Sequence, residues 1–162
     1  MRRAAILMSA AALVIGVADL SAQAKPSFAG TWTMIADPNA TPTPGRGGRG
    51  GLGQGGTIAQ DAKTLTITRT TQNGEVKYVY NLDGSDSKNT ITFGGNPVEQ
   101  TSKLKWDGDK LWVTTSSMVN GAPIETTMVL SYDKEGNLVV DATGPGRGGS
   151  SPTVMKTSYK KS

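Results

Sequence analysis

Apolar and polar side chains alternate with a period of two through most of the chain after residue 57. Leu65 and Ile67 alternate with threonines, and Val76, Tyr78 and Tyr80 share one parity in the following segment. Such alternation indicates β-strands that turn one face to a core and the other to water. Turn-forming pairs such as Asn-Gly and Asp-Gly separate these segments at hairpin spacing. Strands are predicted near residues 29–35, 57–60, 64–71, 75–82, 88–94, 98–106, 110–118, 123–132, 137–143 and 152–160.

Ten short strands in succession, with no helical stretch, predict an all-β fold: an up-and-down antiparallel meander that closes into a barrel. An open sandwich is the alternative. In the barrel, the strand that carries Trp32 should meet the strand that carries Tyr159. Trp32 and Trp106 are expected mainly as packing residues, and the number of large inward side chains favours a partly filled barrel with a small cavity. The inward set should include Leu65, Ile67, Val76, Tyr78, Tyr80, Leu104, Trp106, Leu111, Val113, Thr115, Ile124, Thr126, Met128, Leu130, Tyr132, Leu138, Val140, Met155, Thr157 and Tyr159.

The N-terminal 24 residues have the pattern of a secretory signal. A basic start, Met1-Arg2-Arg3, precedes an apolar run from Ala4 to Ala18, and Ala22-Gln23-Ala24 resembles a signal-peptidase site. The run is shorter than the ~20 apolar residues that a membrane-spanning helix needs. We therefore expect cleavage after Ala24 and a periplasmic or secreted protein, with residues 25–162 forming a single domain without an integral membrane segment.

Residues 37–56 are rich in glycine and proline, and Leu52 is their only large apolar side chain. Because glycine loses much backbone freedom on ordering and little apolar surface is available, this stretch is predicted to be a flexible loop. The sequence Pro-Gly-Arg-Gly-Gly occurs at 44–48 and again at 145–149. In a ten-strand meander both copies lie at the same end, so Arg46, Arg49 and Arg147 would form a basic rim. Low-complexity drift without a role is the alternative explanation of the repeat.

The opposite end of such a meander would be acidic. Its turns hold Asp61, Asp83, Asp86, Asp107, Asp109, Asp133 and Glu135. Aspartates in tight turns commonly accept hydrogen bonds from their own backbone, which explains them without metal binding or catalysis. A calcium site over residues 83–89 is a weak alternative, because the segment lacks a later bidentate glutamate.

The opening segment Phe28-Ala29-Gly30-Thr31-Trp32 resembles the first strand of calycin barrels, the superfamily of lipocalins and fatty-acid-binding proteins. Lys105-Trp106-Asp107-Gly108 and the last strand, ending Val154 to Lys161, are similar to the fatty-acid-binding branch. The resemblance implies a lipocalin-like barrel that binds a small hydrophobic molecule. Two features depart from that branch. Residues 37–56 replace its helical lid, and Thr157 stands where its last strand carries an inward arginine two residues before Tyr159. The nearest cation, Lys156, should point outward.

The composition argues against catalysis. The chain has neither histidine nor cysteine, so the commonest general base, the thiol nucleophile and the usual zinc ligands are missing. A net charge of +4 is too small to indicate nucleic-acid binding. We expect no enzyme activity, no cofactor and no metal.

The interior is the expected functional surface. The sequence predicts a non-catalytic binding protein for a small hydrophobic or amphiphilic, possibly anionic, molecule held in the barrel. The candidate ligand-binding residues are Tyr78, Tyr80, Trp106, Met128, Tyr132, Tyr159, Arg46, Arg49 and Arg147. The alternative is a structural or interaction protein of the cell envelope with a filled barrel. Its protein-binding surface would include the outward residues Val79, Trp112, Val129 and Val139.

Overall fold

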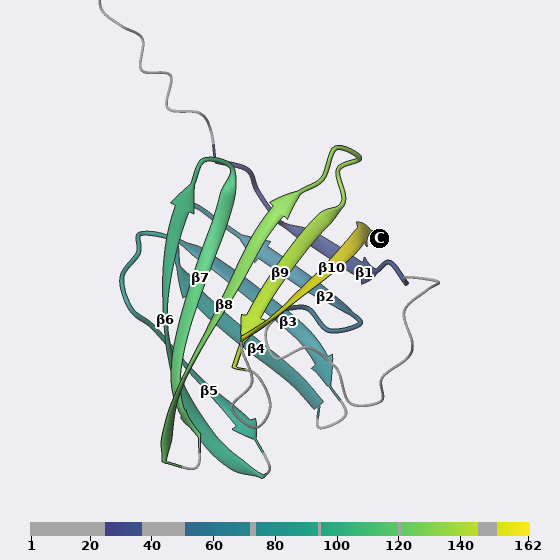
Figure 1. The fold of residues 1–162 in the computed structure, drawn as a ribbon. Coiled ribbons are helices and arrows are strands. Elements are labelled where there is room, and N and C mark those ends of the chain that lie inside the picture. Colours follow the sequence, from purple (N-terminus) through teal and green to yellow (C-terminus); the bar gives the residue numbers. More distant parts are fainter. Residues whose placement is uncertain (1–24, 37–50, 72–73, 94, 120, 146–151) are drawn as a thin grey trace, which may run out of the picture.

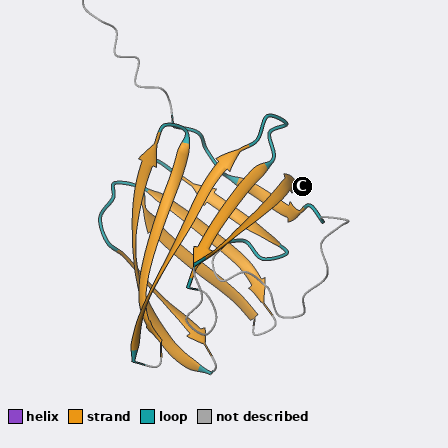
Figure 2. Ribbon diagram, in the orientation of Figure 1, coloured by secondary structure: helices purple, strands orange, loops and turns teal. Residues whose placement is uncertain are grey.

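The computed structural model describes residues 25–36, 51–71, 74–93, 95–119, 121–145 and 152–162. Within these residues every regular element is a strand, and all of them belong to one antiparallel sheet (Figure 2). The all-β prediction is confirmed. The strands are β1 (Gly30–Met34), β2 (Gly55–Gln60), β3 (Thr64–Thr71), β4 (Gly74–Asn81), β5 (Ser87–Phe93), β6 (Asn96–Asp107), β7 (Lys110–Val119), β8 (Ala122–Tyr132), β9 (Leu138–Gly144) and β10 (Thr153–Lys161).

The meander curls into a nearly closed barrel. The order across the sheet is β4-β3-β2-β1-β10-β9-β8-β7-β6-β5, so the first and last strands are neighbours. Figure 1 shows β1 and β10 side by side. In their register Trp32 faces Lys161 and Met34 faces Tyr159. This pairing confirms the expected meeting of the Trp32 and Tyr159 strands and excludes the open sandwich. The two edges of the sheet are instead β4 and β5.

Side chains bridge the two edge strands near the β4–β5 turn. The Asn89 side chain of β5 accepts a hydrogen bond from the Val79 backbone N–H at 2.8 Å and donates one to the Val79 carbonyl at 3.0 Å. The backbone N–H of Asn81 donates to the Ser87 hydroxyl at 2.7 Å. Because these bonds satisfy backbone groups that a neighbouring strand would otherwise pair, they hold the edges together without a strand ladder.

Glycines in β1 and β2 permit close contacts with the neighbouring strands β10 and β3. A Cβ at Gly30 would lie 2.7 Å from the Cε atom of Lys161, whose ammonium sits 5.8 Å from the centre of the Trp32 ring. A Cβ at Gly56 would lie 2.5 Å from the Thr68 carbonyl oxygen. Real Cβ atoms do not approach fixed backbone so closely, so the Gly56 position requires glycine. At Gly30 the flexible end of Lys161 can move, and the positive φ of 154° is what disfavours other residues.

The barrel is plugged at the end where the β2–β3, β4–β5, β6–β7 and β8–β9 turns lie. Phe28 is fully buried there and stacks on Trp106 and Tyr132, with ring centres 6.0 and 5.2 Å away. Its carbonyl accepts a hydrogen bond from the Trp32 indole at 2.9 Å, and its N–H donates to Gln60 at 2.8 Å. We call this the closed end; the opposite end is the open end.

The segment 51–54 contributes to the core, which corrects one prediction. Leu52 is fully buried although it lies in the stretch expected to be a flexible loop. The Gln54 carbonyl accepts a hydrogen bond from the Met34 N–H at 3.0 Å, and the Gly53 carbonyl accepts one from the Tyr159 hydroxyl at 3.0 Å. β2 begins at Gly55, two residues earlier than expected. The prediction failed here because hydrogen bonds from β1 and β10 order a segment whose own composition disfavours order.

The outward apolar residues form a smaller exposed surface than expected. Trp112 and Val79 are 40% and 38% exposed, but Val129 and Val139 are only 8% and 6% exposed. Val129 pairs directly with Trp112 in the register. The sequence correctly placed these side chains outside the barrel, but it could not show that neighbours cover two of them.

Aspartates organise three turns of the closed end. Asp61 accepts hydrogen bonds from the N–H groups of Lys63 and Thr64, and Asp83 accepts from Ser85. Asp133 accepts from the N–H groups of Glu135 and Asn137 and from the Asn137 amide. These hydrogen bonds lower the pKa of all three carboxyls, with the Asn137 side chain as the largest cause at Asp133. The turn explanation of these residues is therefore the one that the geometry supports.

Replacing Asp133 with asparagine should make stability less sensitive to acid. A lowered pKa in the folded state adds stability above the unfolded pKa, about 3.9 for aspartate, and this stability is lost as the pH falls through the folded value. Asp133→Asn should lower the melting temperature at neutral pH, and the difference from wild type should shrink towards about pH 2. Asp109→Asn, in the β6–β7 turn, is the matched control. If the difference in melting temperature between wild type and Asp133→Asn were the same at neutral and acidic pH, the lowered pKa of Asp133 would be contradicted.

Candidate functional site: a cavity in the open half of the barrel

The open half of the barrel encloses a cavity of about 540 Å³. Its walls come from the ends of β3 and β7 and from the starts of β4, β6 and β8, together with residues 90–92 of β5. These strand ends lie opposite the acidic turns. The other half of the barrel is filled by Trp32, Leu65, Leu104, Leu111, Leu130 and Leu138, each at most 5% exposed. The expected partly filled barrel with a small cavity is thus what the structure contains.

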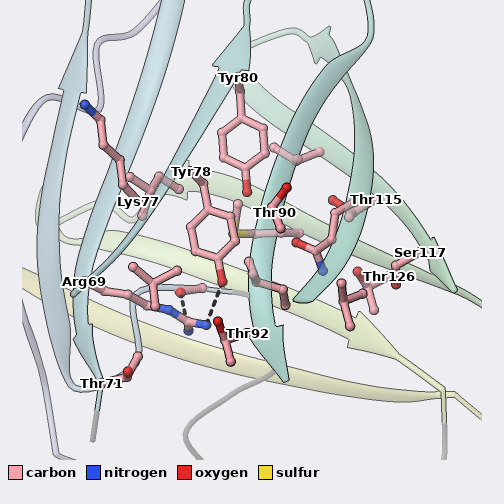
Figure 3. A pocket seen from close by; sticks show the side chains of 18 of the residues that line it. Arg69, Thr71, Lys77, Tyr78, Tyr80, Thr90, Thr92, Thr115, Ser117 and Thr126 are labelled. Carbon is pink, nitrogen blue, oxygen red and sulfur yellow. Dashed lines mark hydrogen bonds between the residues drawn. The ribbon is translucent and has the colours of Figure 1, made fainter. Parts of the chain in front are cut away.

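Arg69 brings a positive charge to the wall of the cavity. It follows Leu65 and Ile67 at the same parity on β3, so its side chain points inward with theirs. One terminal nitrogen donates a hydrogen bond to the Gly51 carbonyl, and the other donates to the Tyr78 hydroxyl, both at 3.0 Å (Figure 3). The guanidinium carbon also lies 5.5 Å from the centre of the Tyr78 ring. The guanidinium is therefore held in one place by groups from two other segments.

Two tyrosines from β4 lie beside Arg69. The rings of Tyr78 and Tyr80 are stacked, with centres 6.2 Å apart and planes 3° from parallel. Tyr80 is 6% exposed, and its burial raises the pKa of its hydroxyl well above the ordinary value, so it is neutral at physiological pH. Both aromatic side chains line the cavity beside the Arg69 cation.

Hydroxyl and amide groups from several strands line much of the remaining wall. Thr115 and Ser117 come from β7 and Thr126 from β8, while the exposed residues Thr90 and Thr92 contribute only along the edge of β5 (Figure 3). Gln100 adds an amide, while Val98, Val113, Val119, Ile91, Ile124 and Met128 supply apolar surface. The lining is therefore mixed, and it suits a molecule that has both apolar and hydrogen-bonding parts.

The cavity also extends between the edge strands. Glu75 and Lys77 alternate with Val76 and Tyr78, which face inward, and yet all four residues line the cavity. Thr90, Ile91 and Thr92 line it from the facing edge of β5. Because consecutive residues of one strand point to opposite faces, these lining residues of both parities indicate that the cavity reaches the edges of β4 and β5.

The sequence-predicted site residues divide into three groups. Tyr78, Tyr80 and Met128 line the cavity. Trp106 and Tyr132 pack with Phe28 at the closed end, and buried Tyr159 bonds to Gly53, so these three lie outside the lining. Arg46, Arg49 and Arg147 lie outside the described residues. Trp106, Tyr132 and Tyr159 were misplaced because alternation predicts only that a side chain points into the barrel. It does not predict at which end of the barrel axis a cavity remains.

Sequence reasoning missed Arg69. It sought a cation on the last strand, by comparison with the fatty-acid-binding proteins, and found none facing inward. The parity of Leu65 and Ile67 extends to residue 69 and could have identified it. An arginine that follows apolar residues of the same parity suggests that the buried face of the strand ends before it. Here that interpretation would be wrong, because Arg69 points inward.

Three further observations bear on function. Within the described residues, no group of three or more acidic, histidine or cysteine side chains is arranged to hold a metal ion. The same part of the chain contains no helix with the length and apolar character to cross a membrane. No protein-family model matches the chain, and no curated protein matches its sequence.

Proposed function

We propose that this protein is an exported, non-catalytic binding protein that holds a small amphiphilic molecule in the open half of a calycin-like barrel. The observation that carries the proposal is the cavity of about 540 Å³, which falls within the roughly 300–1,000 Å³ typical of small-molecule sites. The filled closed half supports it further, since the plug and the leucine core provide a rigid scaffold around the cavity.

Binding would come from burial of the ligand's apolar surface, at roughly 25 cal/mol per Å², and polar groups of the lining would orient the ligand. The residue types of the chain support a role without covalent chemistry, because histidine and cysteine are absent from it. The N-terminal signal pattern supports export. The alternative role as an interaction protein has weaker support, because Val129 and Val139 add little exposed apolar surface beside Trp112.

The first test is binding of phenylnaphthylamine, a neutral dye whose fluorescence rises in apolar surroundings. We expect saturable binding by the wild-type protein. Ser117→Trp, which places an indole in the cavity, should weaken dye binding by about a hundredfold or more, because it occupies the ligand volume. Ser116→Trp is the matched control: the same substitution one residue earlier lies on the exposed outer face and should leave dye affinity unchanged.

Each outcome has a clear meaning. No saturable binding by the wild-type protein would contradict the proposal. Unchanged dye affinity in Ser117→Trp would show that the dye binds elsewhere and would contradict the proposal. Equal weakening by Ser117→Trp and Ser116→Trp, together with lowered melting temperatures of both variants, would show that the substitutions disturb the fold.

A further inference from the structure

Arg69 and Tyr78, which we call the anchor, place a cation and a hydroxyl group side by side in the cavity wall. A guanidinium can only donate hydrogen bonds, so in the 3.0 Å contact the Tyr78 oxygen is the acceptor. The hydroxyl hydrogen of Tyr78 is then left to donate to another acceptor. The anchor therefore combines a permanent positive charge with a neutral donor at one point of the wall, and guanidinium geometry suits a carboxylate.

The rest of the lining restricts the body of the ligand. A straight alkyl chain would have to place its methylene groups against the Gln100 amide and the hydroxyls of Ser117 and Thr126. Burying these polar groups without partners costs free energy. The apolar half of the barrel, where such a chain would fit better, is filled by side chains. The aromatic side chains of Tyr78 and Tyr80, which also line the cavity, instead suit contact with a flat ring.

We propose that the ligand is a compact organic acid: one carboxylate bound by Arg69 and Tyr78, and a flat, oxygen-bearing body in contact with the tyrosine rings and the polar groups of the lining. This inference rests on the proposed function and names its ligand class. The anchor lies on β3 and β4, whereas the family resemblance placed a carboxylate clamp on the last strand, where this chain has Thr157.

The experiment measures how well three probes displace phenylnaphthylamine: para-hydroxycinnamate, its uncharged methyl ester, and decanoate. We expect para-hydroxycinnamate to displace the dye at about tenfold lower concentration than the ester, because a hydrogen-bonded charge pair contributes about that factor. It should also displace the dye at lower concentration than decanoate. In Arg69→Gln the advantage of the acid over the ester should disappear while dye affinity is kept.

Arg69→Gln could destabilise the protein, because Arg69 also bonds to Gly51. A second anchor variant and a charge control therefore complete the test. Tyr78→Phe leaves that bond in place and should reduce the acid's advantage about threefold. Lys105→Gln removes the same charge from an exposed position on β6 outside the cavity and should change nothing. This control separates the anchor from the net charge of the protein.

Several results would overturn the inference while leaving the proposed function intact. They are equal displacement by acid and ester in the wild type, stronger displacement by decanoate, or loss of dye and acid affinity to the same extent in Arg69→Gln. The last result would assign Arg69 a purely structural role as the tie to Gly51. Failure of the dye to bind the wild-type protein would instead remove the proposed function.

Discussion

Phe28→Ala should destabilise the protein by about 3–5 kcal/mol, the range observed when a buried aromatic ring is removed from a core. Phe28 precedes the first strand, yet it is fully buried and stacks on both Trp106 and Tyr132. Alanine would leave a void between these rings and open the closed end to water. Chemical denaturation of the wild type and the variant measures the difference directly.

Two controls make this result specific to the plug. Phe28→Leu keeps an apolar side chain and should lose distinctly less stability than Phe28→Ala. Val154→Ala trims a side chain that is 64% exposed and should change stability by no more than about 0.5 kcal/mol. Because the cavity lies in the other half of the barrel, the dye affinity of folded Phe28→Ala should be unchanged. A loss below about 1 kcal/mol would mean that the plug contributes little to stability.

Alternation and turn spacing were sufficient to predict the meander. Every strand was expected within two residues of its observed bounds, and the pairing of β1 with β10 followed from the strand count. The position of the sheet's edges did not follow from it. That β4 and β5 remain unpaired as strands depends on Asn89 and Ser87, whose side chains take the place of a ladder. A period-two pattern contains no information about side chains that replace the hydrogen bonds of a strand ladder.

The site was less predictable than the fold, because it depends on where volume is missing. Tyr78 and Trp106 both face inward, but Tyr78 lines the cavity and Trp106 packs under Phe28. Whether an inward side chain lines a cavity or is packed in the core depends on the summed volumes of the side chains at its level of the barrel. Arg69 could have been identified from parity, whereas the contribution of Gly51 to its hydrogen bonding could not, since that contact joins residues 18 apart in the sequence.

The segment 51–54 links the stability of the barrel to the shape of the site. Its carbonyls accept hydrogen bonds from Arg69, Met34 and Tyr159, which belong to three different strands. Leu52 lies among these bonds and is the segment's only apolar side chain. If burial of Leu52 holds the segment in place, the same side chain supports both the core and the carbonyl that orients Arg69.

Leu52→Ala should therefore cost about 2–5 kcal/mol, as for other fully buried leucines. Below its melting temperature, the folded variant should also lose part of the preference for para-hydroxycinnamate over its ester, because Gly51 no longer fixes the guanidinium. Ile35→Ala, at a residue that is 40% exposed beyond the end of β1, is the control and should alter neither property. Full retention of stability in Leu52→Ala would show that hydrogen bonds alone hold the segment. Loss of stability without loss of preference would show that the site does not depend on it.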